Sequence, residues 1–143
     1  MDKYKFIIIP FLGILFSQII KFILESIKCK RLCIERLFYG SGGMPSTHSS
    51  FVSSLTTIIY LEYGFSSIYF AISLIFSLVI IYDSMGVRYE AGKQAEVLND
   101  IVEKINFNKK INELKEKVGH KPIEVLCGVL LGMSIGLIFF DLL

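Results

Sequence analysis

The sequence predicts an all-α, integral membrane helical bundle with about four transmembrane helices. Three observations predict this fold class: hydrophobic residues make up 53% of the 143 residues, they fall in four blocks, and these blocks approach the length of a membrane span. A helix needs about 20 mainly apolar residues to cross the hydrocarbon of a bilayer. Spanning segments must satisfy their backbone hydrogen bonds internally, which favours helices. The whole chain, residues 1–143, is expected to form a single membrane-embedded domain.

The four apolar blocks meet the length of a span to different degrees. Residues 6–24 and 123–143 are long enough, and residues 66–82 are nearly so. The block at 51–63 reaches a span only if its helix begins in the polar residues before it, so we expect a short or partly re-entrant second helix. The first block follows two lysines, as a signal peptide does, but no small-x-small cleavage site comes after it. We therefore expect a retained anchor.

A long charged segment, residues 84–121, separates the third block from the fourth. Its stretch AGKQAEVLNDIVEKI consists mostly of good helix formers. Apolar residues recur along the segment at helical spacing: Val97, Ile101, Ile105, Ile111, Leu114 and Val118. This pattern predicts one or two amphipathic helices at the membrane surface, either as a solvated cap or as a cover over a site.

The distribution of charge indicates how the chain lies in the membrane. The net charge is only +2, so a nucleic-acid partner is not indicated. Of the 15 basic residues, 12 lie in the first and third loops, which share one face of a four-span protein. The positive-inside rule places that face in the cytoplasm and both termini outside, in the plasma membrane of a bacterium. Lys3 and Lys5 favour the opposite orientation.

Cysteine usage indicates neither a disulfide framework nor a metal centre. The chain has three cysteines, too few for such a framework. Cys29 and Cys33 could be combined with the two histidines as zinc ligands, but their spacing does not match a zinc site. Cys127, within an apolar block, is expected to be a small core residue. No metal and no cofactor are expected.

The stretch GGMPSTHSS, residues 42–50, precedes the second block. Gly42 and Gly43 permit a close backbone approach, and Ser46 or Thr47 can cap the helix that follows. His48 would lie in the first turn of that helix, where backbone N–H groups favour an anion. The alternative interpretation is an ordinary capped helix that carries a passive histidine.

The stretch GHKPIEV, residues 119–125, holds the second histidine, immediately before the fourth block. Pro122 suits the first turn of a helix, and Glu124 lies four residues after His120, within reach of a hydrogen bond. A carboxylate bound to an imidazole fixes its tautomer and raises the basicity of the other nitrogen, as a nucleophilic histidine requires. The alternative is a helix start at which Glu124 only complements the helix dipole.

Further polar residues belong to the same predicted face. In YDSMGVRYEAGKQ, Asp83 and Arg88 could form a simple ion pair or line a polar pocket with Lys93. Lys21 lies within the first apolar block, where it could extend towards the interface or point into the same pocket. Two histidines, a carboxylate and several cations suit transfer of a phosphoryl group to an imidazole, since one histidine can attack phosphorus while the other protonates the leaving oxygen.

Three motifs in this order, GGMPSTHSS, YDSMGVRYEAGKQAEVLN and GHKPIEVLCGVLLG, resemble the divergent branch of the type 2 phosphatidic acid phosphatase superfamily, which includes the vanadium-dependent haloperoxidases. The resemblance covers about residues 17–136. It implies a helical, metal-independent phosphatase acting on lipid phosphates. PSTH is similar to PSGH of the superfamily, which implies His48 as general acid, with Thr47 in place of the glycine. HKPIE is similar to HxxxD, which implies His120 as nucleophile and Glu124 as its orienting carboxylate.

The chain departs from the superfamily pattern at its arginine motifs. It has no arginine–proline pair, and the positions six and seven before His120 are Leu114 and Glu113 rather than arginine and serine. The cations that would replace these arginines are therefore assigned by placement: Lys21, Arg88 and Lys93. Ser46, Thr47 and Asp83 complete the predicted phosphate-binding residues.

The expected function is hydrolysis of a lipid-linked phosphate or diphosphate through a phosphohistidine. One alternative is an inactive protein that binds or transports lipid phosphates, and another is a structural membrane module whose charged segment binds a partner. The expected substrate is a membrane lipid phosphate, and a second copy of the chain is the candidate protein partner.

Overall fold

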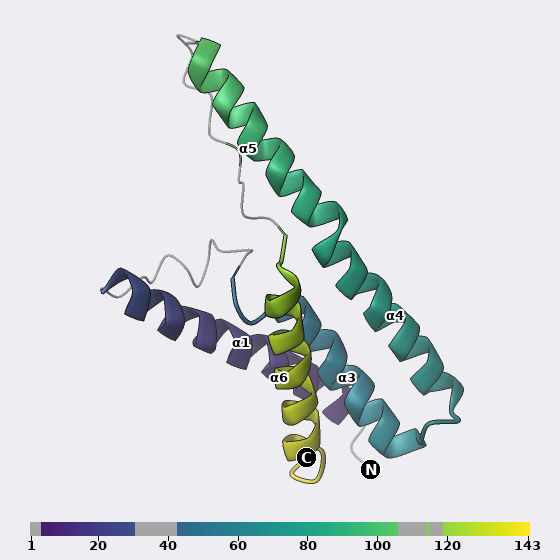
Figure 1. Ribbon diagram of the computed structural model, residues 1–143. Coiled ribbons are helices and arrows are strands. Elements are labelled where there is room, and N and C mark those ends of the chain that lie inside the picture. The colour runs from purple at the N-terminus through teal and green to yellow at the C-terminus, as the bar shows by residue number, and fades with distance from the viewer. Residues whose placement is uncertain (1–3, 31–42, 106–113, 115–118) are drawn as a thin grey trace.

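The computed structural model describes residues 4–30, 43–105, 114 and 119–143. Every regular element within these ranges is a helix (Figure 1). The helices are α1 (Lys5–Cys29), α3 (Thr47–Tyr63), α4 (Ile68–Met85), α5 (Val87–Ile105) and α6 (Pro122–Phe140). The predicted all-α membrane fold is confirmed.

Three stretches of helix in the described ranges are long and apolar enough to cross a membrane: α1, the stretch Ile68–Val102 formed by α4 and most of α5, and α6. The remaining bundle helix, α3, has 17 residues. At 1.5 Å per residue it measures about 26 Å, somewhat less than the roughly 30 Å of bilayer hydrocarbon. The sequence correctly predicts that the second block forms the shortest of the bundle helices.

Helix α3 occupies the centre of the bundle and packs against α1, α4 and α6. Its partner face on α6 is a row of glycines at every fourth position, Gly128, Gly132 and Gly136, all buried. A Cβ added at Gly136 would lie 2.8 Å from the Cβ of Thr57 on α3. Small residues allow two membrane helices to approach closely, which is the main source of helix association without a hydrophobic driving force.

Hydroxyl side chains of α3 form hydrogen bonds between the helices. Ser50 Oγ donates to the carbonyl of Gly13 on α1 at 3.1 Å, and Ser53 Oγ donates to the carbonyl of Val129 on α6 at 3.2 Å. Ser77 Oγ on α4 donates to the carbonyl of Val52 at 3.2 Å. These bonds connect α3 to all three of its neighbours. The serines of α3 therefore stabilise the packing of the helices inside the bundle.

The two ends of the described chain lie at the same end of the bundle (Figure 1). There Lys5 Nζ bonds Glu62 Oε2 at 2.6 Å and lies 4.1 Å from the ring centroid of Phe140. Lys5 is buried, with a relative exposure of 9%. This cluster joins α1, α3 and α6 at the end opposite to both histidines.

Helix α5 continues beyond α4 and projects away from the bundle (Figure 1). Within the described helices it packs only against α4. Its Val97, Leu98 and Ile101 are exposed, in keeping with the predicted amphipathic character. Because the described part of α5 packs against α4 and projects away from the bundle, it favours the solvated cap over the cover. Ile111 and Val118, predicted to continue the stripe, lie outside the described residues.

Candidate functional site

His120 is the most buried ionisable group on the basic face, with a relative exposure of 2%. Its Nδ1 lies 3.1 Å from Glu124 Oε2. Because a carboxylate only accepts, Nδ1–H donates and Nε2 is left as the unprotonated nitrogen of the neutral ring. The same carboxylate oxygen accepts the backbone N–H of Lys121 at 3.1 Å. Glu124 therefore fixes both the orientation and the tautomer of His120, as the spacing in the sequence predicts.

His48 lies in the first turn of α3, with its ring centroid 6.3 Å from that of His120 and the two ring planes at 60°. The side chain is exposed. Residues 72 positions apart are thus brought together from two helix starts. At this separation the two rings lie edge to face, so one small group beside them could contact both. Both histidines thus lie at helix starts on the same face of the bundle, as the sequence motifs predict.

Backbone contacts hold these helix starts against one another. The N–H of Ser46, just before α3, donates to the carbonyl of Glu124 on α6 at 2.8 Å, and the N–H of His120 donates to the carbonyl of Ser84 on α4 at 3.1 Å. A Cβ added at Gly119 would collide with the backbone of Tyr89 on α5. The glycine before His120 is therefore required for the close approach of this segment to α5.

Ser46 has a structural role rather than an exposed phosphate-binding one. Its side chain is completely buried and caps α3, accepting the N–H of Ser49 at 3.4 Å and the hydroxyl of Ser49 at 2.9 Å. The predicted cap is confirmed. Because the hydroxyl is engaged and inaccessible, Ser46 positions His48 by fixing the first turn of α3.

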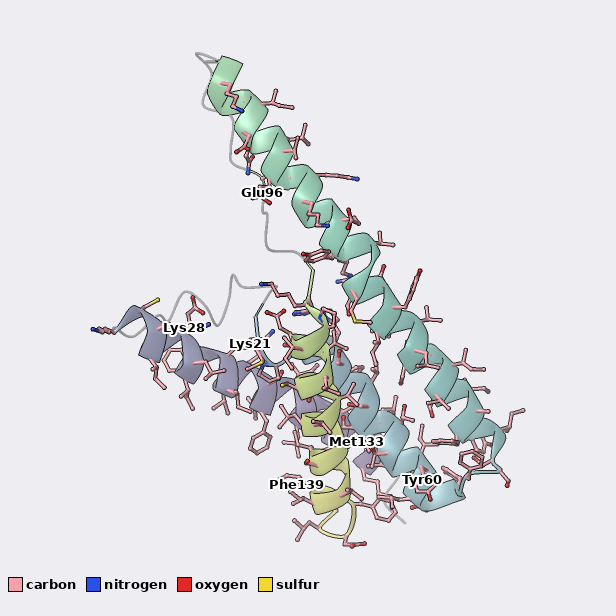
Figure 2. All side chains as sticks on the ribbon, viewed as in Figure 1. Lys21, Lys28, Tyr60, Glu96, Met133 and Phe139 are labelled. Carbon is pink, nitrogen blue, oxygen red and sulfur yellow. The ribbon has the colours of Figure 1, made fainter. Side chains whose placement is uncertain are left out.

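Lys21 reaches the start of α3 from the middle of α1. Its Nζ donates to Thr47 Oγ1 at 2.8 Å, and the side chain is buried, with 5% exposure. Figure 2 shows Lys21 beside the upper end of α6. Of the two explanations for this lysine, the structure favours a cation that points into the site. Thr47, the residue in place of the superfamily glycine, orients that cation.

Arg88 lies at the start of α5 and forms an ion pair with Asp83 at the end of α4, with Nε 2.7 Å from Oδ2. Both side chains are partly exposed, at 46% and 40%. Lys93 lies further along α5, where it bonds Glu90 at 3.0 Å and lies over the ring of Tyr89. Thus Arg88 and Asp83 lie near the histidines, whereas the described contacts of Lys93 are within its own helix.

The surroundings of His120 lower its pKa. Burial is the main cause, since it disfavours the charged imidazolium, and the positive charges of Lys21 and Arg88 act in the same direction. The hydrogen bond and the charge of Glu124 oppose this effect. The net pKa lies below the ordinary value of 6.5, so the ring is neutral at physiological pH. A neutral imidazole with a carboxylate on Nδ1 is the form that can act as a nucleophile.

A cavity of about 250 Å³ adjoins the site between α1 and α6. Its polar lining includes Lys21 and Glu124, which are site residues, together with Glu25 and Lys28. Glu25 and Lys28 are not among the site residues that the sequence predicts. The available signal was their helical spacing from Lys21, at four and seven positions, which puts them on one face of α1.

No group of three or more His, Cys, Asp or Glu side chains within the described residues is arranged to hold a metal ion. Cys29 lies exposed at the end of α1 and Cys127 lies half-buried on α6. Cys33, the third cysteine, lies outside the described residues.

The membrane-length helices and the buried polar site at one end of their bundle define an integral membrane protein of the helical class. The chain belongs to the family described as the Divergent PAP2 family, whose model matches residues 3–135. It is 40% identical over 141 residues to the uncharacterized membrane protein YuiD of Bacillus subtilis (strain 168), covering 88% of this chain and 87% of that protein. No solved structure matches the chain significantly. The family resemblance inferred from the three motifs is confirmed.

Proposed function

We propose that the protein is a metal-independent membrane phosphatase that hydrolyses a lipid-linked phosphate or diphosphate through a phosphohistidine. The observation that carries the proposal is the arrangement of His120, bound through Nδ1 to Glu124 at 3.1 Å, with His48 at 6.3 Å between ring centroids. Membership of the Divergent PAP2 family supports the same chemistry.

In the first step, Nε2 of His120 attacks the phosphorus in line with the oxygen that leaves. The N–P bond forms as the bond from phosphorus to the lipid oxygen breaks. His48, in its protonated form, gives a proton to that oxygen, and the lipid departs as an alcohol or as a monophosphate. Glu124 stabilises the positive charge that develops on the ring of His120. Lys21 and Arg88 balance the nonbridging oxygens.

In the second step, water hydrolyses the phosphohistidine. His48, now neutral, takes a proton from the water molecule as its oxygen attacks phosphorus. The N–P bond breaks, inorganic phosphate is released, and both histidines return to their starting protonation states. The two steps use each histidine twice, so loss of either one should abolish turnover.

The site is proposed to face the cytoplasm. The basic residues gather at the end of the bundle that holds the histidines, and this favours that face inside. Lys5, at the opposite end, is buried against Glu62 and Phe140. Because its charge is neutralised within the bundle, it opposes this orientation less than its position in the sequence implies. A topology reporter fused after Leu143 should be active only outside the cytoplasm; a cytoplasmic signal would overturn the orientation.

A second candidate function is binding or transport of lipid phosphates without hydrolysis. The ion pair of Arg88 with Asp83, at 2.7 Å, favours it, because a paired arginine contributes less to the stabilisation of a transferring phosphoryl group. On this alternative, His120→Asn should bind lipid phosphates as well as the wild type does.

Phosphate release from the purified protein in vesicles tests the proposal. Phosphatidate, polyprenyl phosphate and polyprenyl diphosphate should be offered to the wild type, His120→Ala and His48→Ala. We expect release by the wild type alone, insensitive to EDTA and inhibited by vanadate, which mimics a five-coordinate phosphorus. Absence of turnover on all three lipid classes would contradict the proposed activity.

A further inference from the structure

Two adjoining cavities lie between α1 and α6, and they differ in character. The first, of about 250 Å³, has the polar lining described above. The second, of about 170 Å³, has an apolar lining: Ile20, Leu24, Met44, Pro45, Cys127 and Leu131. Leu24 and Met44 line both cavities. The two spaces therefore form one groove with a polar half and an apolar half.

The polar half lies at the end of the bundle that carries the site, and the apolar half lies deeper in the membrane span. On α1 the lining runs from Lys28, next to the helix end at Cys29, back to Ile20. On α6 it runs from Ile123, in the first turn, to Leu131 about two turns further in. Both helices thus change from polar to apolar lining in the same direction.

The polar half is continuous with the candidate active site. Glu124 lines it and also bonds His120, and Lys21 lines it and also bonds Thr47 beside His48. Figure 2 shows Lys28 further along α1 than Lys21. The polar half holds two lysines and two glutamates, so its charge is balanced, and its lysines are the groups that can contact an anionic head group. The apolar half complements hydrocarbon.

We propose that this groove between α1 and α6 binds the hydrocarbon chain of a lipid phosphate whose phosphate is held at His48 and His120. The inference rests on the proposed function and adds to it the place where the hydrocarbon chain of the substrate lies. The chain attached to the leaving oxygen passes Leu24 and Met44 and continues along Ile20, Cys127 and Leu131. Soluble phosphate esters cannot fill the apolar half and are poor substrates.

The size of the groove agrees with a lipid occupant. Pockets that enclose a whole small molecule usually measure about 300 to 1,000 Å³, and the two halves of the groove, about 250 and 170 Å³, together lie within that range. A groove of this size holds a head group and the first part of a long chain. The remainder of a lipid chain would stay in the bilayer beside α1 and α6. A soluble ligand has no such chain and makes no contact there.

The thiol of Cys127 provides a test of occupancy that does not depend on turnover. In the variant Cys29→Ser with Cys33→Ser, Cys127 is the single remaining cysteine. Its alkylation by a membrane-permeant maleimide should be measured in vesicles containing phosphatidate or polyprenyl phosphate, a neutral lipid of the same chain length, or inorganic phosphate. We expect several-fold slower alkylation with a lipid phosphate only. Equal rates in all samples, or equal protection by the neutral lipid, would overturn the inference.

A pair of tryptophan substitutions on α1 tests specificity. Leu24→Trp fills the junction of the two halves, and Ile23→Trp, at an exposed neighbour, is the matched control. Leu24→Trp places a larger side chain in the path of the hydrocarbon chain. It should raise KM for a long-chain phosphate about tenfold, the order of discrimination that an apolar pocket provides, and change KM for a soluble aryl phosphate much less. Equal loss on both substrates, or no loss, would contradict the groove. A wild type without turnover would refute the proposed phosphatase activity. The alkylation of Cys127 would still show whether a lipid phosphate occupies the groove.

Discussion

Replacement of Glu124 by glutamine removes one charge from the site and leaves its shape intact. The carboxylate accepts two hydrogen bonds, from Nδ1 of His120 and from the N–H of Lys121, both at 3.1 Å. Glutamine retains an oxygen acceptor at this position, so the capping of α6 should survive. The negative charge that holds the imidazolium during attack on phosphorus is lost.

The size of the effect follows from the type of hydrogen bond. Glu124 is mostly buried, with a side-chain exposure of 19%, so solvent screens the pair weakly. A hydrogen bond to a charged group contributes about 1.5 to 3 kcal/mol and a neutral one about 0.5 to 1.5. The difference of about 1 to 1.5 kcal/mol corresponds to a loss of kcat of roughly five- to tenfold. Since Glu124 raises the pKa of His120 against the effect of burial, the acidic limb of the pH profile should move to lower pH in Glu124→Gln.

The assay is phosphate release from a lipid phosphate in vesicles between pH 5 and 9, on wild type, Glu124→Gln and His120→Ala. Thermal unfolding of each protein in detergent checks that the variants are folded. An unchanged kcat in Glu124→Gln, together with an inactive His120→Ala, would refute the orienting role of the carboxylate. An acidic limb that moves to higher pH would refute the electrostatic account.

The other predictions concern packing, protonation and phosphate binding. Gly128→Ala places a Cβ 2.5 Å from the carbonyl oxygen of Ser46; it should lower stability by about 1 to 3 kcal/mol, and an unchanged melting temperature would contradict the packing. His120 has a lowered pKa in the folded state, so the unfolded state binds its proton first: stability should be complete above 6.5 and fall as pH decreases below it, and His120→Asn should reduce this dependence in thermal unfolding. Lys21→Met should weaken binding of a lipid phosphate about tenfold by loss of a charge-assisted hydrogen bond, whereas Lys104→Met on α5 should not, and equal affinities in both variants would exclude Lys21 from the site.

The sequence predicts the site best where chemistry is local. The spacing of His120 and Glu124 fixes a contact within one helix turn, and the structure has it at 3.1 Å. The cap at Ser46 is predictable for the same reason. The short second span at α3 follows from the length of its apolar block. The contact of His120 with Glu124 and the cap at Ser46 depend on residues within four positions of one another, and the short span depends on one continuous block.

Other parts of the site depend on contacts that the sequence does not encode locally. The carbonyl of Ser84, which accepts the N–H of His120, has no side-chain signature, because any residue supplies a carbonyl. The direction of Lys21 depends on how α1 crosses α3, and its bond to Thr47 spans 26 residues. The position of Lys93 on α5, bonded to Glu90, is set by the projection of that helix from the bundle, which charge counting alone does not predict.

Detection of the covalent intermediate tests the central claim most directly. Wild-type protein and His120→Ala should be mixed with a lipid phosphate, quenched in base within one turnover, and digested for mass spectrometry. A phosphohistidine is stable in base, and we predict it on His120 in the wild type and its absence in His120→Ala. Phosphate release without a phosphoryl group on His120, or undiminished release by His120→Ala, would contradict the mechanism.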